Sequence, residues 1–131
     1  MIHSFNLRVY YEDTDAGGIV YHANYLKFAE RARTEMIRDC GLTNSSVRNE
    51  FGVIIVVRHI DINYTAPAKL EDSLVVESEI VETGRTSFLM KQVVLREDHP
   101  LATLLVKLVC VDVGTGKATR TPDKLLAILN R

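Results

Sequence analysis

The sequence has almost no net charge, few cysteines and no long hydrophobic run. Its 131 residues carry 16 basic and 17 acidic side chains, for a formal net charge of −1, so electrostatics gives no reason to expect nucleic acid or an anionic membrane as a partner. No apolar stretch is long enough to cross a bilayer, and the first ten residues lack the basic and apolar regions of a signal peptide. We therefore expect a cytoplasmic protein without a transmembrane segment.

Candidate metal ligands are also scarce. The two cysteines, Cys40 and Cys110, are predicted to be small buried side chains rather than a disulfide or a redox pair. The four histidines are scattered without metal-ligand spacing. A calcium loop starting at Asp13 would place Asn24 where a glutamate is required. The sequence therefore predicts no metal site, and no motif indicates a cofactor.

What the chain does contain is one helical pattern. Its 47% hydrophobic and 25% charged residues indicate a folded protein, and its length fits a single domain over residues 1–131. Apolar or small side chains recur every three or four residues between positions 25 and 40, which predicts one long helix. Asn24 is its expected N-cap and Gly41 its expected stop.

The remaining patterns are mostly those of strands. Strands are predicted over residues 5–11, 52–64, 72–81, 87–96 and 101–112. Short turn segments between the later strands favour antiparallel pairing, and Thr121 with Pro122 is expected to begin a short final helix. The sequence therefore predicts an α+β fold, with an antiparallel sheet around one long central helix. The last strand is apolar on both faces, so we expect a partner subunit to cover its outer face.

Residues 10–25 bring an acid, two glycines and a helix start together. A carboxylate such as Asp15 can act as general base or nucleophile, and a helix start offers free N–H groups to a developing oxyanion. Gly17 and Gly18 leave room beside the acid for a substrate. This arrangement suits acyl transfer, with a carbonyl held near His22. The structural alternative, common in arbitrary proteins, is that Asp15 is only a turn acid and His22 a surface residue.

The same segment closely resembles a known family. Residues Val9–Tyr25, continuing through Glu30–Met36, are similar to the hot-dog-fold acyl-CoA thioesterases, and most of all to the Tol-Pal-associated branch related to 4-hydroxybenzoyl-CoA thioesterase. Weaker similarity extends over nearly the whole chain, through Tyr64–Ala68, Gly84–Ser87 and Val109–Asp112. Because of this resemblance, we favour a catalytic role for Asp15 over a role as a turn acid.

The resemblance implies roles for particular residues. Asp15 would be the catalytic carboxylate, and the His22 backbone N–H would polarise the thioester carbonyl; the His22 side chain is typical of this branch but varies in relatives. Such proteins form homodimers, joined edge to edge and often paired into homotetramers, with active sites at the dimer interface. There, residues near Arg85, Thr86 and Ser87 of the partner subunit would approach the thioester.

The expected function is therefore hydrolysis of acyl-CoA, with short or otherwise small acyl groups. An alternative from another class is a protein that binds acyl carriers or envelope-biogenesis proteins and has weak or vestigial hydrolytic activity. A hot-dog dehydratase is a third option, but those enzymes place their histidine in a different glycine and proline context. The sequence itself names no acyl group and assigns no residue to the phosphates of CoA.

Overall fold

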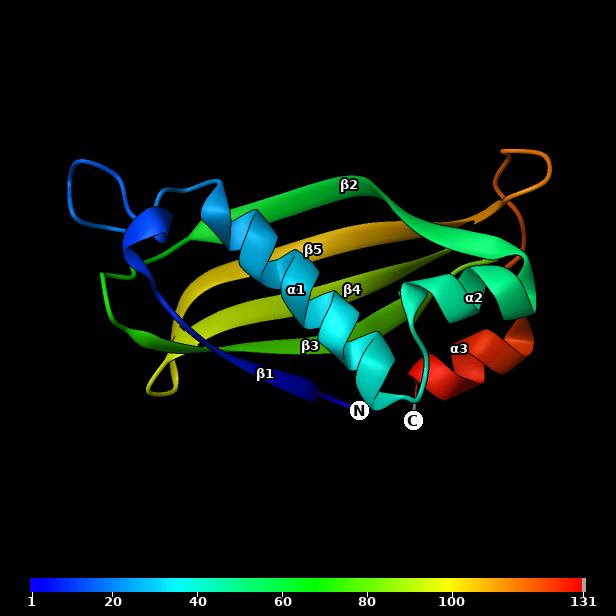
Figure 1. The fold of residues 1–131 in the computed structure, drawn as a ribbon, viewed down its shortest axis with the longest axis horizontal. Coiled ribbons are helices and arrows are strands. Elements are labelled where there is room, and N and C mark those ends of the chain that lie inside the picture. Colours follow the sequence, from blue (N-terminus) through cyan, green and yellow to red (C-terminus); the bar gives the residue numbers. More distant parts are fainter. Residues whose placement is uncertain (131) are drawn as a thin grey trace.

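The computed structural model describes residues 1–130 as one five-stranded sheet with helices packed against it (Figure 1). All strand pairs are antiparallel, and the order across the sheet is β1-β3-β4-β5-β2, which leaves β1 and β2 as its edges. The elements in chain order are β1 (His3–Arg8), the short 3-10 helix η1 (Tyr11–Asp13), α1 (Asn24–Asp39), α2 (Asn44–Phe51), β2 (Val53–Tyr64), β3 (Ser73–Thr83), β4 (Ser87–Arg96), β5 (His99–Asp112) and α3 (Asp123–Leu129).

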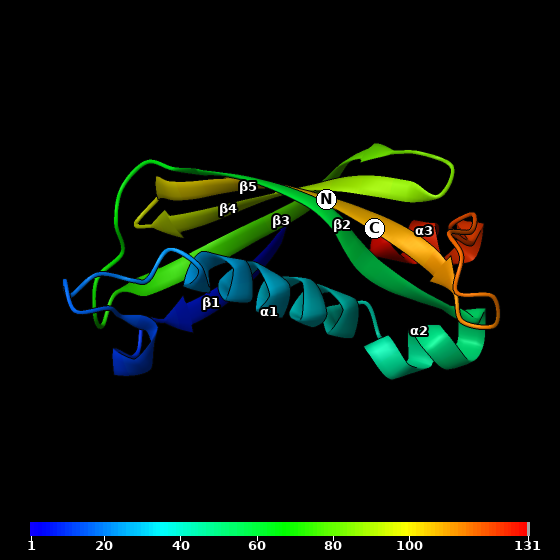
Figure 2. The same cartoon turned by 90° about the horizontal axis from the view of Figure 1, so that it is seen from above.

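The helix α1 lies across one face of the sheet (Figure 2). Its 16 residues match the predicted helix to within one residue at either end. Phe28, Ala29 and Ala32 have no exposed surface, and they recur at the spacing that places side chains on one helix face. Because two of the three are alanines, the helix backbone can approach the sheet closely.

A buried polar group ties the middle of α1 to the sheet. The Gln92 side chain of β4 is fully buried, and its Nε2 donates to the Ala29 carbonyl and to Ser78 Oγ, each at 2.9 Å. Its Oε1 accepts a 2.9 Å hydrogen bond from Arg33 Nη1. Since every polar atom of the amide has a partner, the network avoids the cost of an unpaired buried group and fixes how helix and sheet meet.

Several predicted boundaries are wrong by a few residues. The first strand ends at Arg8 rather than at residue 11, because the chain then turns into η1. The final helix begins at Asp123 with Pro122 as its N-cap, so Thr121 lies outside it. The last strand starts at His99, since Glu97 and Asp98 alone form the tight turn, both with positive φ.

The helix α2 was not predicted at all. Its sequence, NSSVRNEF, has a single buried side chain, Val47, so it shows little hydrophobic periodicity. Local capping defines it instead: Thr43 and Ser46 exchange side-chain to backbone hydrogen bonds at its start. Gly52 ends it with a φ of 66°, in the left-handed region, which is why β2 begins at Val53 and not at Gly52.

The loop between β2 and β3 is fixed by one charged pair. Asp72 Oδ2 accepts from Arg96 Nη1 at 2.7 Å and from the Lys69 N–H at 2.8 Å. The Asp72 carbonyl accepts from the Val9 N–H at 2.9 Å, which joins this loop to the end of β1. Burial favours a higher pKa for Asp72, but the Lys69 and Arg96 donors outweigh it, and the pKa lies below the ordinary aspartate value.

We expect this pair to stabilise the fold at neutral pH and to lose its effect in acid. A carboxyl whose folded pKa is lowered contributes stability above its unfolded pKa, and the contribution disappears as the pH falls through the folded pKa. Asp72→Asn should therefore lower the free energy of unfolding near pH 7 by about 1–2 kcal/mol. The difference from wild type should shrink at a pH about one unit below the ordinary aspartate pKa of about 3.9.

Urea unfolding at both pH values measures this difference. Asp123→Asn is the matched control, because its carboxylate is 85% exposed and reaches Arg120 only at 3.5 Å, so its effect should be small at either pH. A destabilisation by Asp72→Asn that is equally large in acid would contradict the role given to the Asp72 charge.

Candidate active site

Asp15 lies in a small hairpin between η1 and α1. Its N–H donates to the Ile19 carbonyl at 3.0 Å, and its carbonyl accepts from the Gly18 N–H at 3.1 Å. Thr14 and Val20 form a bridge at the base of this hairpin. Gly18 has a φ of 80°, in the left-handed region that favours glycine. The hairpin therefore holds the backbone of Asp15 directly ahead of the helix.

The Asp15 carboxylate is exposed and lightly bonded. Its Oδ1 accepts from the Gly17 N–H at 2.8 Å, and within residues 1–130 this is the only hydrogen bond to the carboxylate. A Cβ on Gly17 would lie 3.2 Å from the same oxygen, so glycine leaves room for this close approach. Asp15 also lines a cavity of about 480 Å³ with Tyr11, Thr14, Ala16, Gly18 and Leu70. An ionised carboxylate in this position can reach a water molecule or an electrophilic carbon in the cavity.

The hairpin is docked onto the loop that follows β2. The Val20 N–H donates to the Ala68 carbonyl at 2.9 Å, and Ile19 forms a bridge with Lys69. The Ala68 N–H in turn donates to the buried Tyr25 Oη at 3.0 Å, in the first turn of α1. Both polar groups of Ala68 are therefore used to join the hairpin to the helix.

The neighbouring acid, Asp13, has a structural role. It is buried, and its Oδ2 accepts from the Tyr10 N–H at 2.8 Å. Its carbonyl accepts from the Tyr21 N–H at 3.0 Å and from Asn24 Nδ2 at 2.8 Å. This corrects the expected N-cap: Asn24 is the first helical residue, Ala23 occupies the cap position, and the Asn24 side chain holds the chain before the hairpin instead.

The start of α1 leaves backbone donors unused. The Asn24 N–H donates to the Tyr21 carbonyl at 2.8 Å and the Leu26 N–H to the Ala23 carbonyl at 3.2 Å. The N–H groups of His22 and Ala23 form no hydrogen bond with any residue from 1 to 130. Donors of this kind at a helix start can stabilise negative charge on a substrate oxygen.

The His22 side chain is exposed and does not bond to Asp15. Its ring lies 4.5 Å from the Tyr21 ring and 6.4 Å from that of Tyr64, between centroids. The described part of the chain contains no hydrogen bond to the imidazole. His22 also lines an apolar cavity of about 390 Å³, together with Ile19, Val20, Tyr25, Tyr64, Thr65, Ala66 and Pro67. The Asp15 carboxylate and the helix start at His22 are thus two separate features of the candidate site.

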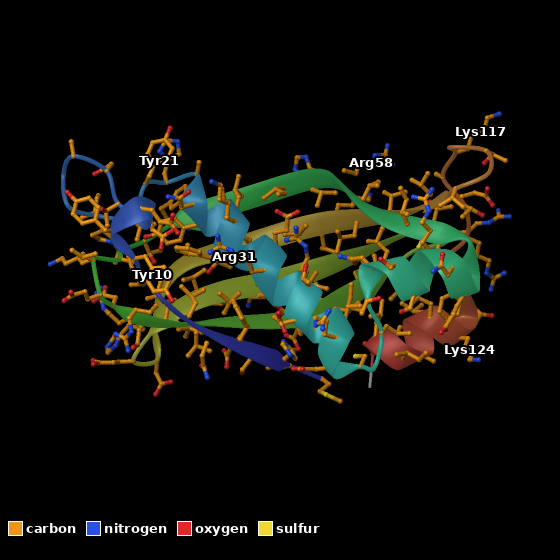
Figure 3. All side chains as sticks on the ribbon, in the orientation of Figure 1. Tyr10, Tyr21, Arg31, Arg58, Lys117 and Lys124 are labelled. Atoms are coloured by element: carbon orange, nitrogen blue, oxygen red, sulfur yellow. The ribbon has the colours of Figure 1, made fainter. Side chains whose placement is uncertain are left out.

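Thr86 and Ser87 lie at the other end of the sheet. On β5, Ala102 is opposite Tyr64 of β2, and Val109, seven positions further along, is opposite Ser87 of β4. At about 3.3 Å per residue this separation is about 23 Å. Figure 3 shows Tyr10 and Tyr21 at the hairpin end and Lys117 at the opposite one. A single chain therefore does not bring Thr86 and Ser87 to Asp15.

Another cavity of about 390 Å³ lies along the C-terminal half of α1 and contains none of the predicted site residues. Its lining includes Arg33, Met36, Ile55, Phe88, Leu108 and Leu129.

Residues 1–130 hold no group of three His, Cys, Asp or Glu side chains that fits a metal ion. None of the helices in these residues has the length and apolar character needed to span a membrane.

Two site residues were missed from the sequence, Tyr64 and Tyr25. Tyr64 Oη donates to the His22 carbonyl at 2.8 Å, and the Tyr64 and Tyr25 rings meet edge to face at 5.3 Å. Tyr25 was treated only as part of the helix pattern. The stretch Tyr64–Ala68 resembles the family but was given no role; that resemblance is the sequence signal that could have identified Tyr64 as a site residue.

The chain is similar to known thioesterases. The family described as the Thioesterase-like superfamily matches residues 9–129. The acyl-CoA thioesterase YbgC of Haemophilus influenzae is 44% identical over 124 residues, covering 95% of this chain and 91% of that protein. The acyl-CoA thioester hydrolase YbgC of Escherichia coli O157:H7 is 43% identical over 124 residues, covering 92% and 90%.

Solved structures point the same way. The crystal structure of a probable thioesterase from Bartonella henselae superposes with a TM-score of 0.86 at 36% identity, covering 93% of this chain and all of that one. These relatives support a thioester hydrolase activity. A family match over nearly the whole described chain, together with relatives above 40% identity, shows that the protein belongs to the thioesterase-like superfamily.

Proposed function

We propose that the protein hydrolyses acyl-CoA thioesters with short or otherwise small acyl groups, and that Asp15 is its catalytic carboxylate. The observation that carries this proposal is the placement of the exposed Asp15 carboxylate beside an open cavity and directly ahead of a helix start with two unpaired N–H groups. The names of the relatives from H. influenzae and E. coli, an acyl-CoA thioesterase and an acyl-CoA thioester hydrolase, support the substrate class.

In the proposed reaction, the thioester carbonyl oxygen lies against the N–H groups of His22 and Ala23. Asp15 removes a proton from water as the water oxygen attacks the carbonyl carbon, and these donors stabilise the oxyanion that forms. The C–S bond then breaks, and the CoA thiolate leaves and takes up a proton. Alternatively, Asp15 attacks the carbon itself, and water hydrolyses the resulting anhydride. Gly17 and Gly18 leave the acid accessible on either route.

Asp15→Asn should fold normally but lose most hydrolysis. The amide cannot accept the proton of water or form an anhydride, while the Oδ1 bond to Gly17 can persist. We expect kcat/KM on acyl-CoA to fall at least about 100-fold, measured by thiol release over a panel of acyl-CoA chain lengths and acyl carrier protein thioesters. Asp123→Asn is the matched control, because its carboxylate is 85% exposed and lies on α3, away from the proposed site. Unchanged turnover in Asp15→Asn would contradict the proposal.

A single turnover of the wild-type enzyme in water enriched in oxygen-18 distinguishes the two routes. Label in the Asp15 carboxylate requires direct attack by Asp15, because only water that opens the anhydride at the aspartyl carbonyl can place it there. Attack by water places it only in the released acid. Mass spectrometry of the peptide that contains Asp15 gives the answer.

We further propose that two copies pair through the β2 edge and complete each other's sites. As an open edge, β2 presents unpaired backbone groups, and its Val56 and Val57 side chains are 36% and 43% exposed. In an antiparallel two-fold pair, the Tyr64 end of one β2 would face the Val53 end of the other. Val56 lies in register, through Val109, with Ser87. Such pairing supports the expectation that Thr86 and Ser87 come from the partner subunit.

Mixing two inactive variants tests this pairing. If each site takes Asp15 from one chain and Thr86 and Ser87 from the other, a hybrid of Asp15→Asn with the double variant Thr86→Ala, Ser87→Ala contains one intact site. Random mixing of equal amounts should then restore about a quarter of the wild-type sites. No recovery after mixing by denaturation and refolding, with wild-type protein refolded in parallel as the control, would indicate that the sites do not combine residues from two chains.

The domain organisation, the branch of the family and the location of the protein are part of the same proposal. We propose a single hot-dog domain over residues 1–131 with α1 as its central helix, assembled as dimers or tetramers. The segment Val9–Tyr25 supports placement in the Tol-Pal-associated branch. Cys40 and Cys110 are free thiols, which suits a reducing compartment and supports a cytoplasmic location.

A further inference from the structure

Tyr64 forms the one side-chain hydrogen bond within residues 1–130 to the backbone of the helix start at His22 and Ala23. It is the last residue of β2, and its Oη donates to the His22 carbonyl at 2.8 Å. The ring is anchored from behind, since it meets the buried Tyr25 ring edge to face at 5.3 Å. The other edge of the Tyr64 side chain is open, with 42% of the residue exposed.

The His22 carbonyl and the Ala23 N–H belong to one peptide group. Because this group is planar and trans, its C=O and N–H point in opposite directions. A hydrogen bond that fixes the direction of the His22 carbonyl therefore also fixes the direction of the Ala23 N–H. It also draws electron density toward the carbonyl oxygen, which makes the N–H a stronger donor. The Ala23 N–H is one of the unpaired donors at the start of α1.

We infer that Tyr64 is a positioning residue, whose hydroxyl orients and polarises the His22–Ala23 peptide so that the Ala23 N–H can hold the substrate oxyanion. This inference rests on the proposed function, because it assumes that the thioester carbonyl lies at the helix start. It assigns to β2 a part in catalysis that is separate from its place in the sheet.

The surroundings of Tyr64 suit a permanent donor. Burial of part of the hydroxyl, followed by the nearby Tyr25, raises the pKa of Tyr64 above the ordinary tyrosine value. The hydroxyl therefore stays protonated at neutral pH and donates to the carbonyl. Tyr25 itself is held by the Ala68 N–H at 3.0 Å, so the support behind the ring is part of the same framework that docks the Asp15 hairpin.

Tyr64→Phe removes the hydroxyl and keeps the ring on Tyr25. We expect kcat for acyl-CoA hydrolysis to fall roughly ten-fold, with KM within about two-fold of wild type, because the lost interaction acts mainly on the transition state. Tyr21→Phe is the matched control: its ring lies against His22 at 4.5 Å, its side chain is 46% exposed, and its hydroxyl makes no hydrogen bond within residues 1–130. A kcat for Tyr64→Phe equal to that of Tyr21→Phe, or a loss confined to KM, would overturn the inference.

A vibrational measurement reads the oxyanion site directly. In the Asp15→Asn background, acetyl-CoA labelled with carbon-13 at the thioester carbonyl can be bound without turnover and its C=O stretch recorded by difference infrared spectroscopy. We expect the stretch to lie below that of free acetyl-CoA, and to move back toward the free value when Tyr64→Phe is added. The spectrum of free acetyl-CoA is subtracted, so that the remaining band comes from bound substrate and stays readable even if part of the double variant fails to fold.

The outcomes separate the inference from the proposed function. A bound carbonyl with the same frequency as the free thioester in Asp15→Asn would show that the helix start does not polarise the substrate, and both would fail. A lowered frequency that Tyr64→Phe leaves unchanged would retain the proposed oxyanion site and reject the role of Tyr64. A lowered frequency that Tyr64→Phe reverses, and Tyr21→Phe does not, would support both.

Discussion

The geometry of the candidate site depends on the two backbone hydrogen bonds of Ala68. Its carbonyl accepts the Val20 N–H of the Asp15 hairpin, and its N–H donates to Tyr25 Oη in the first turn of α1. The hairpin and the start of α1 thus both meet the distant loop after β2 at one fully buried residue. A hairpin of a few residues has little stability of its own, so this docking, and not local turn preference, gives the Asp15 carboxylate a defined position relative to the helix start. The Asp72–Arg96 pair secures the same loop from the other side.

Much of this framework could be predicted from local patterns. The periodic apolar residues of α1 identified the helix within one residue, and β4 was predicted with the observed bounds of residues 87 to 96, since both elements carry their signal within a short window. The helix α2 gave no such signal, because its hydrogen-bonded caps and not a buried face define it. The N-cap role expected for Asn24 failed for a related reason. Its side chain donates a hydrogen bond to the Asp13 carbonyl, eleven residues earlier. The preference of asparagine for N-cap positions carries no information about such a contact.

The candidate site was predictable only in part. The acid, the glycines and the helix start are contiguous, so the sequence alone places them together, and the hairpin of residues 14–20 keeps them so. Tyr64 lies 42 residues from His22 along the chain, and its contact is a hydrogen bond to a backbone carbonyl. Such a contact leaves no pattern in the sequence because any carbonyl can accept. The network of Gln92 with Ala29 and Ser78 was invisible for the same reason.

The exposure of Asp15 bears on how the proposed chemistry can work. In one chain the carboxylate is open to water on the cavity side, and hydrogen bonds to a developing oxyanion are weak where water competes for both partners. An exposed acid and unpaired N–H groups at a helix start are therefore an incomplete catalyst within a single chain. A second copy that packs against the open β2 edge would remove water from both groups at once. On this view the edge-to-edge pairing is a requirement of the reaction and not only a way to cover Val56 and Val57.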